Sequence, residues 1–253
     1  MKAIVISEKT HTHTKLGYTS IGTKLEEEIY SETVSEVLEI IARYTPVLTW
    51  ILLAKAIGES TLILRRLKVE EELSKLRKEE PEVIRLAEKL KKDEPLDDID
   101  KWNLKEISEA SGWDVEDMKE ELINLDKDPS EREERYWQLF NKYYEEAQKF
   151  KEQKDYTQAA EKLWGAITAL IKVYAAKQRI LVSQWRAETL WNVVYKNFRE
   201  PLKSKFDNLL INGSELHRHF YEEHLPLEAY EKRWDECMKL IDEILKPSPS
   251  SVE

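Results

Sequence analysis

A short segment near the C-terminal end of the chain concentrates side chains that can transfer protons and bind phosphate. It holds three of the five histidines in the sequence, His217, His219 and His224, and Arg218 lies between the first two. A neutral imidazole can take the proton from an RNA 2′-hydroxyl, and a fixed guanidinium can stabilise the anionic phosphorus centre that forms. Arg218 and His224 are separated by five residues. Arg218, His219 and His224 are therefore candidate catalytic residues for chemistry at a phosphate group.

The same segment also supports a structural or binding interpretation, which we favour. Short motifs of this kind often arise by coincidence, and His217 can hydrogen-bond a helix end while Tyr221 packs inward. Glu222 and Glu223 would repel a phosphate backbone, which disfavours cleavage of RNA. We therefore name His217, Tyr221 and Glu222, together with Trp164 from an upstream helix, as candidate binding residues.

Metal chemistry receives weak support from the sequence. Cys237 is the only cysteine, so an intramolecular disulfide and a cysteine-based zinc site are both excluded. His217 and His224 are seven residues apart with Glu223 nearby, and residues 11–13 form a His-x-His pair, but no third ligand can be assigned. No glycine-rich phosphate loop is present. We predict no metal ion and no cofactor.

Apolar residues at helical spacing predict the elements that must position this segment. After a turn over 126–129, Ser130 is a suitable N-cap for one helix, and Asp155 is suitable for a second, longer helix. Their expected buried faces consist of Tyr136, Phe140, Tyr143, Ala147 and Phe150 in the first helix, and of Ala159, Leu163, Ile167, Leu170 and Tyr174 in the second. A helix with so broad an apolar surface is expected at the centre of a bundle.

Further helices are expected toward the C-terminus. Two shorter ones cover 185–198 and 201–211, and Asn212 with Gly213 is expected to stop the second of them. A last amphipathic helix covers 227–245. These elements together predict an antiparallel helical bundle.

Two segments of this half resemble the archaeal PaREP family, which belongs to the wider group of HEPN helical bundles. They are AAEKLWGAITALIKVYA at 159–175 and LHRHFYE at 216–222. The family's second segment is similar to Leu-His-x-Asn-Phe-Tyr-Glu, and this chain has His219 in place of Asn. The resemblance covers roughly residues 130–245. It implies an up-and-down bundle that pairs with itself or with a partner. Some relatives in the wider group are metal-independent ribonucleases, and others accompany small nucleotidyltransferases without catalysis of their own. The ribonucleases carry an Arg that is followed, after four to six positions, by a His; Arg218, His219 and His224 are similar to that pattern, so the resemblance implies an Arg-x5-His motif for metal-independent RNA cleavage as the alternative function.

The N-terminal half is also predicted to be helical. Residues 23–44 carry an apolar stripe that ends before Pro46, and Gly58 is expected to end the helix that follows. Residues 104–122 match a degenerate helix-turn-helix pattern, with Gly112 at the turn.

The second helix of that unit is acidic, which disfavours DNA as a partner. It carries Glu116, Asp117, Glu120 and Glu121 at positions where a DNA reader presents Arg, Lys, Asn or Gln to the base edges. We expect a structural or protein-binding helix pair instead.

The sequence therefore predicts an all-α chain with four segments. A mobile N-terminal arm covers 1–22, a helical region with the degenerate helix-turn-helix covers 23–127, a HEPN-like bundle covers 128–246, and a disordered tail covers 247–253. The low content of glycine (6) and proline (8) in 253 residues is consistent with long helices. The dense mixture of Glu, Lys and Arg is typical of proteins from thermophiles.

Net charge restricts the partners that the chain can bind. A formal charge of −10 argues against a whole-molecule nucleic-acid binder, because such proteins need a positive field. RNA or a nucleotide is kept as an alternative partner, which a local basic patch would bind. The expected partner is a second copy or another helical protein, because Trp185, Trp191 and Trp234 lie on helices that also carry polar faces.

The sequence predicts a cytoplasmic protein without membrane contact. The most apolar stretch, 46–57, is shorter than the roughly 20 residues that a transmembrane helix needs, and it contains Lys55. No signal peptide is recognised, and a single cysteine suits a reducing compartment.

Overall fold

The computed structural model describes residues 34, 36, 47–182 and 187–246, and all the regular elements in this part of the chain are helices. The predicted all-α class is thereby confirmed for the described residues. The predicted arm over 1–22 and the predicted tail over 247–253 lie outside them, as does most of the helix expected over 23–44.

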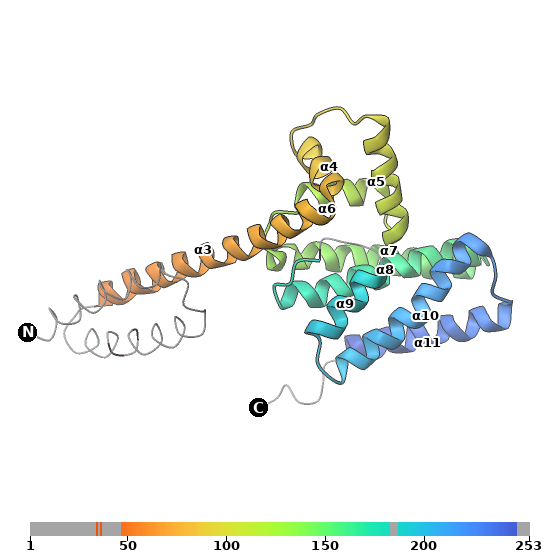
Figure 1. The fold of residues 1–253 in the computed structure, drawn as a ribbon. Helices are drawn as coiled ribbons and strands as arrows, with labels where there is room; N and C mark the ends of the chain where they lie inside the picture. Colours follow the sequence, from red (N-terminus) through yellow and green to blue (C-terminus); the bar gives the residue numbers. More distant parts are fainter. Residues whose placement is uncertain (1–33, 35, 37–46, 183–186, 247–253) are drawn as a thin grey trace, which may run out of the picture. The chain divides into compact units, whose positions relative to one another are not determined.

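Nine α-helices and one 3₁₀ helix are described in this part of the chain (Figure 1). They are α3 (Val47–Glu79), α4 (Pro81–Lys91), α5 (Asp98–Ser111), α6 (Val115–Ile123), η1 (Pro129–Arg132), α7 (Glu133–Glu152), α8 (Tyr156–Lys177), α9 (Ala187–Asn197), α10 (Leu202–Glu222) and α11 (Leu227–Leu245). The chain divides into two compact units, Met1–Leu64 and Arg65–Glu253, and the candidate site lies in the second. The boundary predicted between residues 127 and 128 stays a prediction.

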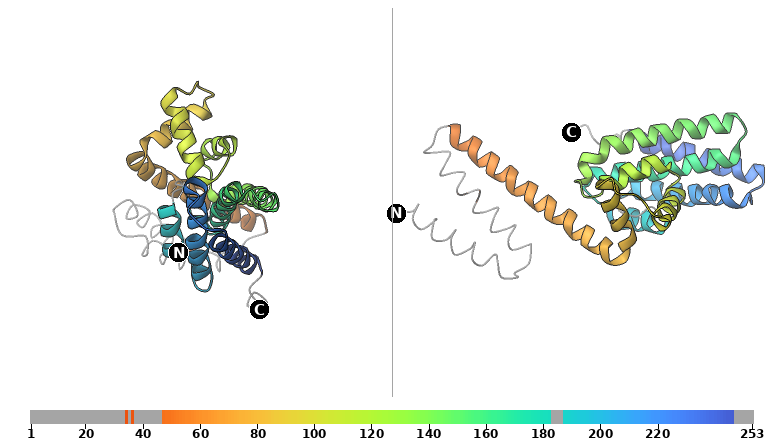
Figure 2. Two further views of the ribbon diagram at one scale, coloured as in Figure 1. Left: turned by 90° about the vertical axis from the view of Figure 1, so that its right-hand side faces the viewer. Right: turned by 90° about the horizontal axis from the view of Figure 1, so that it is seen from above.

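Helix α8 is the centre of the second unit. Fifteen of its residues are buried, on every side of the helix, as its apolar sequence predicted. Helices α7 and α10 pack directly on α8, and α11 packs on α10. Figure 2 shows these four helices running alongside one another. The core continues from them into α4, α5 and α6 without interruption.

The turn between α5 and α6 is fixed on α8 by a very close backbone crossing. Gly112 ends α5 in a left-handed conformation with φ +70°, and a Cβ atom added at Gly165 would lie 2.6 Å from the Gly112 carbonyl oxygen. Trp113 Nε1 donates a hydrogen bond of 2.9 Å to the carbonyl of Gly165, and Thr168 Oγ1 donates one of 3.0 Å to the carbonyl of Ser111. The structure thus contains two helices around the Gly112 turn, while their membership of the helix-turn-helix class stays a prediction.

Three predicted helix boundaries were wrong. Gly58 lies inside α3, where it is exposed and interrupts nothing. Gly213 lies inside α10, because its missing side chain leaves room for Ile167: a Cβ atom there would lie 2.5 Å from Ile167 Cδ1. Asp128, not Ser130, is the N-cap at the start of η1, and its carboxylate accepts from the Ser130 amide at 2.9 Å. The predicted cap at Asp155 is confirmed, since its side chain accepts from the Gln158 amide.

Candidate functional site

Four of the seven residues that the sequence singled out line one open pocket of about 340 Å³. The pocket walls come from four helices, α5, α8, α9 and α10. They consist of Ala110, Trp164, Ala187, Ser214, His217, Arg218 and Tyr221. Trp164 is therefore brought to the 217–221 segment, about fifty residues further along the chain. His219, Glu222 and His224 are not among the lining residues.

The register of α10 explains which of its residues face the pocket. Ser214, His217, Arg218 and Tyr221 are spaced i, i+3, i+4 and i+7, so they share one face of the helix. The His217 ring stacks on Trp164 with 5.2 Å between centroids and 16° between planes. Tyr221 meets His217 edge to face, also at 5.2 Å. An aromatic wall of three rings therefore borders the pocket.

Two of these rings also satisfy the carbonyl groups at the end of α5. Trp164 Nε1 donates a hydrogen bond of 2.9 Å to the carbonyl of Ala110, and the Tyr221 hydroxyl donates one of 3.3 Å to the carbonyl of Glu109. The last carbonyls of a helix lack partners within the helix, so these bonds stabilise the α5 terminus against α8 and α10. The pocket wall is thus held in place without any ligand.

His217 is a neutral member of this wall. Burial lowers its pKa to about 4, so the ring carries no charge at neutral pH. Its Nδ1 atom is buried and has no hydrogen-bond partner among the described residues. A histidine with so low a pKa is a weak proton acceptor near pH 7, which makes His217 a packing and contact group.

Arg218 is exposed, and its charge is already engaged by two carboxylates. Its Nε donates to Glu222 at 2.8 Å, and its Nη1 lies 3.8 Å from a Glu215 oxygen. His224 Nε2 lies 3.6 Å from the other oxygen of Glu215. The predicted Arg-x5-His pair is therefore brought to opposite sides of one carboxylate, Glu215, which the sequence analysis did not consider.

His219 lies on a different side of α10 from the pocket. It is buried, its Nδ1 accepts a hydrogen bond of 3.0 Å from the Leu225 amide, and its ring packs against Tyr230 at 5.5 Å. Burial, followed by the nearby His224, lowers its pKa. These contacts hold the connection between α10 and α11, just after Glu223 ends α10 with φ +46°.

We predict that His219→Ala lowers the free energy of unfolding by about 1–2 kcal/mol, because the Leu225 amide loses its acceptor and the ring leaves a gap beside Tyr230. His219→Asn should cost less, since an amide oxygen can accept the same hydrogen bond. Arg218→Ala should change the free energy of unfolding less than either substitution of His219, because its ion pairs are exposed to solvent. Urea unfolding of the three variants tests this, and equal losses for Ala and Asn would show that the hydrogen bond is unimportant.

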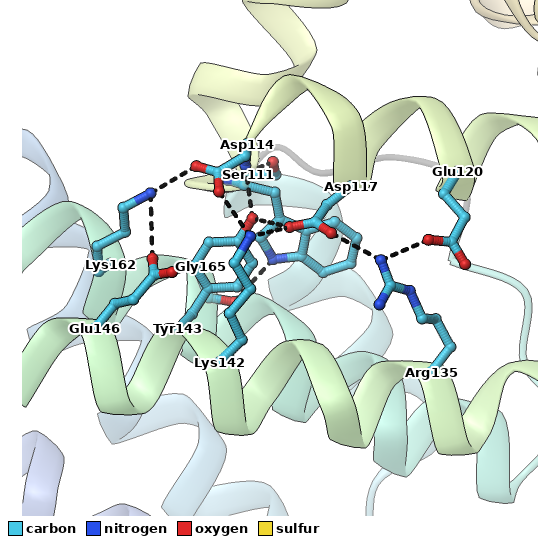
Figure 3. A network of polar contacts seen from close by, with 11 residues as sticks. Ser111, Asp114, Asp117, Glu120, Arg135, Lys142, Tyr143, Glu146, Lys162 and Gly165 are labelled. Atoms are coloured by element: carbon cyan, nitrogen blue, oxygen red, sulfur yellow. Dashed lines mark hydrogen bonds and ion pairs between the residues drawn. The ribbon is translucent and has the colours of Figure 1, made fainter.

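A polar network behind the pocket joins the α5–α6 turn to α7 and α8 (Figure 3). Asp114 binds Lys142 and Lys162, each at 2.7 Å. Asp117 accepts from Tyr143 at 2.5 Å and from Lys142 at 2.7 Å. Figure 3 shows these side chains converging between the helices, with Arg135 bridging Asp117 and Glu120.

Glu121 belongs to a second, fully buried polar cluster. It forms ion pairs with Arg132 and with Lys172, the latter at 2.7 Å, and it accepts from the Tyr136 hydroxyl at 3.1 Å. Lys172 also donates to the carbonyl of Val182 at 2.9 Å. Asp117 and Glu121 are thus buried, and of the four acidic residues on α6 only Glu116 and Glu120 are exposed.

The described residues contain no group of three or more His, Cys, Asp or Glu side chains arranged to hold a metal ion. Among the same residues, no helix has the length and apolarity needed to cross a membrane.

Comparison with known proteins gives one match. The model of the archaeal PaREP1/PaREP8 family matches residues 135–241, which run from the start of α7 into α11. Searches of the curated proteins and of the solved structures found no match. The resemblance predicted from the sequence is confirmed for the C-terminal half, and every residue that lines the pocket except Ala110 lies inside the matched segment.

Proposed function

We propose that this PaREP1/PaREP8-type chain is a non-catalytic binding module whose ligand site is the pocket between α5, α8 and α10. The observation that carries the proposal is the convergence of Trp164, His217, Arg218 and Tyr221 on one pocket. Concave sites that combine aromatic walls with a few polar groups are the usual form of ligand sites in proteins. The bonds from Trp164 and Tyr221 to α5 hold this site open before a ligand arrives.

Binding is better supported than catalysis by the state of the charged groups. Phosphate chemistry needs a histidine that can exchange a proton near neutral pH and a cation that is free to contact the phosphate. His219 is buried and its Nδ1 already accepts from the Leu225 amide, while Arg218 already pairs with Glu215 and Glu222. The shared position of Arg218 and His224 beside Glu215 is the one observation that favours the competing proposal, a ribonuclease built on the Arg-x5-His motif.

A ligand screen and an RNA cleavage assay on the full chain separate the two proposals. For the binding module, we expect some compounds of a small-molecule set to raise the melting temperature of the wild type, and His217→Leu to abolish the response while the protein stays folded. We expect no RNA cleavage. Cleavage that disappears in both Arg218→Ala and His224→Ala would establish the ribonuclease instead.

Self-association is part of the proposal and has a different structural basis from the one first expected. Trp234 is buried in the core, and Trp191 donates a hydrogen bond to Asp207, while Trp185 lies outside the described residues. Ile99 and Trp102, three residues apart on α5, are 63% and 59% exposed. Exposed apolar pairs of this kind suit a helix-mediated dimer.

Light scattering at micromolar concentration tests self-association directly. We expect a dimer for the wild type and a monomer for Trp102→Glu, because a carboxylate cannot be buried unpaired in an apolar contact. A monomeric wild type would contradict self-association, and the proposed partner would then be another helical protein.

A further inference from the structure

Among the residues that the structure describes, more carboxylates than cations surround the pocket. Glu106 lies four residues before Ala110 on α5, and Glu161 lies three residues before Trp164 on α8, so each is one helical turn from a lining residue. On α10, Glu215 and Glu222 flank Arg218.

Most of this negative charge is not balanced. Arg218 is shared by two carboxylates, which leaves that group with an excess of one negative charge. Glu109 pairs with Lys105 at 3.4 Å. Among the described residues, Glu106 and Glu161 have no ion-pair partner within 4 Å.

The Tyr221 hydroxyl lies in the field of these groups. Burial, followed by Glu109, Glu161 and Glu106, raises its pKa to about 12. Burial, together with Asp114 and Glu109, also raises the pKa of Glu161 against the opposing effect of Lys162. A half-buried carboxylate whose negative charge is disfavoured is stabilised by any cation that approaches it.

The wall of the pocket suits a cation as well. Tyr221 is 53% exposed, and the neutral His217 ring stands edge-on beside it. Aromatic faces attract ammonium and guanidinium groups, and the attraction increases when the site is shielded from water. A phosphate would meet the opposite situation, because it would have to compete with Glu215 and Glu222 for Arg218.

We propose that the pocket binds a free, small organic cation in which an ammonium or guanidinium group is carried by a short apolar chain. Tyr221 contacts the cation, Glu161 supplies the counter-charge, and the apolar chain lies against the aromatic wall. The volume of about 340 Å³ suits a small molecule and limits the size of the ligand. The inference rests on the proposed binding function and narrows it to one chemical class.

Isothermal titration of the full chain at low ionic strength tests the charge requirement with matched probes. The n-butylguanidinium ion and n-butylurea have nearly the same shape and differ in charge, and adenosine monophosphate provides an anion. We expect saturable binding of n-butylguanidinium at one site per chain, binding of n-butylurea that is at least about tenfold weaker, and no binding of the nucleotide. Added salt should weaken the guanidinium binding.

Substitutions at two positions, Glu161 and Tyr221, test the roles assigned to these residues in cation binding. Glu161→Gln should weaken n-butylguanidinium binding about tenfold, whereas Glu134→Gln, an exposed carboxylate on α7, should leave it unchanged. Tyr221→Leu should weaken it by a similar factor, whereas Tyr221→Phe should retain it, because the aromatic face is kept. Circular dichroism establishes that each variant is folded.

The possible failures are distinct from one another. Equal binding of n-butylurea and n-butylguanidinium, or preferred binding of the nucleotide, would overturn the cation inference and leave the pocket as a binding site. At least tenfold tighter binding of a blocked Gly-Arg-Gly peptide would show that the cation comes from a protein partner and would overturn the free ligand. Absence of binding by every probe, together with no response in the wider screen, would overturn the inference and the binding function together.

Discussion

Replacing Glu121 with Gln is expected to lower the free energy of unfolding by about 3–5 kcal/mol, one of the two largest effects that we predict. Glu121 is the carboxylate between two buried cations, Arg132 and Lys172, and glutamine keeps its volume but not its charge. Without it the two cations repel each other away from water. Urea unfolding at neutral pH measures the loss.

An exposed carboxylate of the same helix provides the control. Glu116 pairs with Lys119 at 2.7 Å on the surface of α6, so Glu116→Gln should change the free energy of unfolding by less than about 0.5 kcal/mol. Adding Lys172→Met to Glu121→Gln should recover part of the stability, since one of the two uncompensated cations is removed. A loss below about 1 kcal/mol for Glu121→Gln would show that the cluster does not depend on this charge.

Glu121 also makes the free energy of unfolding depend on pH in the acid range. Burial alone would raise the pKa of Glu121, but Arg132 and Lys172 outweigh burial and hold it at about 2, below the ordinary 4.5. As the pH falls, the Glu121 carboxyl therefore takes up its proton at a higher pH in the unfolded chain than in the folded protein. Its contribution to the free energy of unfolding is complete above pH 4.5 and is lost as the pH falls toward 2. This contribution amounts to roughly 3 kcal/mol. The stability difference between wild type and Glu121→Gln should narrow over that range, and a constant difference would contradict the assignment.

Replacing Gly165 with Ala should produce the second large loss, about 2–3 kcal/mol. The added methyl group would lie 2.6 Å from the Gly112 carbonyl oxygen, which is backbone and cannot move without displacing the α5–α6 turn from α8. The hydrogen bond between Trp113 and the Gly165 carbonyl would be strained as well. Thermal unfolding monitored by circular dichroism provides the measurement.

Alanine substitutions at two other glycines provide comparisons for the stability loss expected of Gly165→Ala. At Gly58 an added methyl group meets no atom of the described residues within 4 Å, so Gly58→Ala should not lower stability and should favour the helix by up to about 1 kcal/mol. At Gly213 the obstacle is the end of the Ile167 side chain, which can rotate, so Gly213→Ala should cost less than Gly165→Ala. Equal effects at Gly165 and Gly58 would mean that the close crossing does not exist.

The sequence predicted the helices more reliably than their ends. The apolar stripes of α7, α8 and α11 and the cap at Asp155 were all found, because periodicity and capping are local properties of the chain. The sequence predicts that Gly58 and Gly213 each end a helix, and neither residue does. Whether a glycine ends a helix or admits a neighbouring helix depends on what packs against it, and one sequence does not contain that information.

The sequence predicted only part of the candidate site, again because the packing between helices is not contained in one sequence. The cluster over 217–224 was treated as one group, but the period of α10 turns His217, Arg218 and Tyr221 toward the pocket and His219 toward α11. That separation could have been derived from the spacing once a continuous helix was assumed. The contributions of Ala110, Glu109 and Glu161 could not, since they depend on how α5 crosses α8 and α10.

The buried cluster around Glu121 was missed because its members are far apart in the sequence and of ordinary types. Arg132 and Lys172 look like surface cations in their local sequence, and Glu121 looks like part of an acidic face. Burial of all three results from the packing of α6, η1 and α8 against one another. Buried charges of this kind are expected to be costly when unpaired, which is why the cluster carries our largest stability prediction.

We propose that this protein binds its ligand in the pocket beside Trp164. Nuclear magnetic resonance tests it most directly, by following the indole N–H of Trp164 and the ring protons of His217 and Tyr221 during a titration with n-butylguanidinium. We predict that the three signals move together and saturate on one binding curve. Signals that stay fixed at all three residues while others elsewhere in the chain respond would contradict the claim.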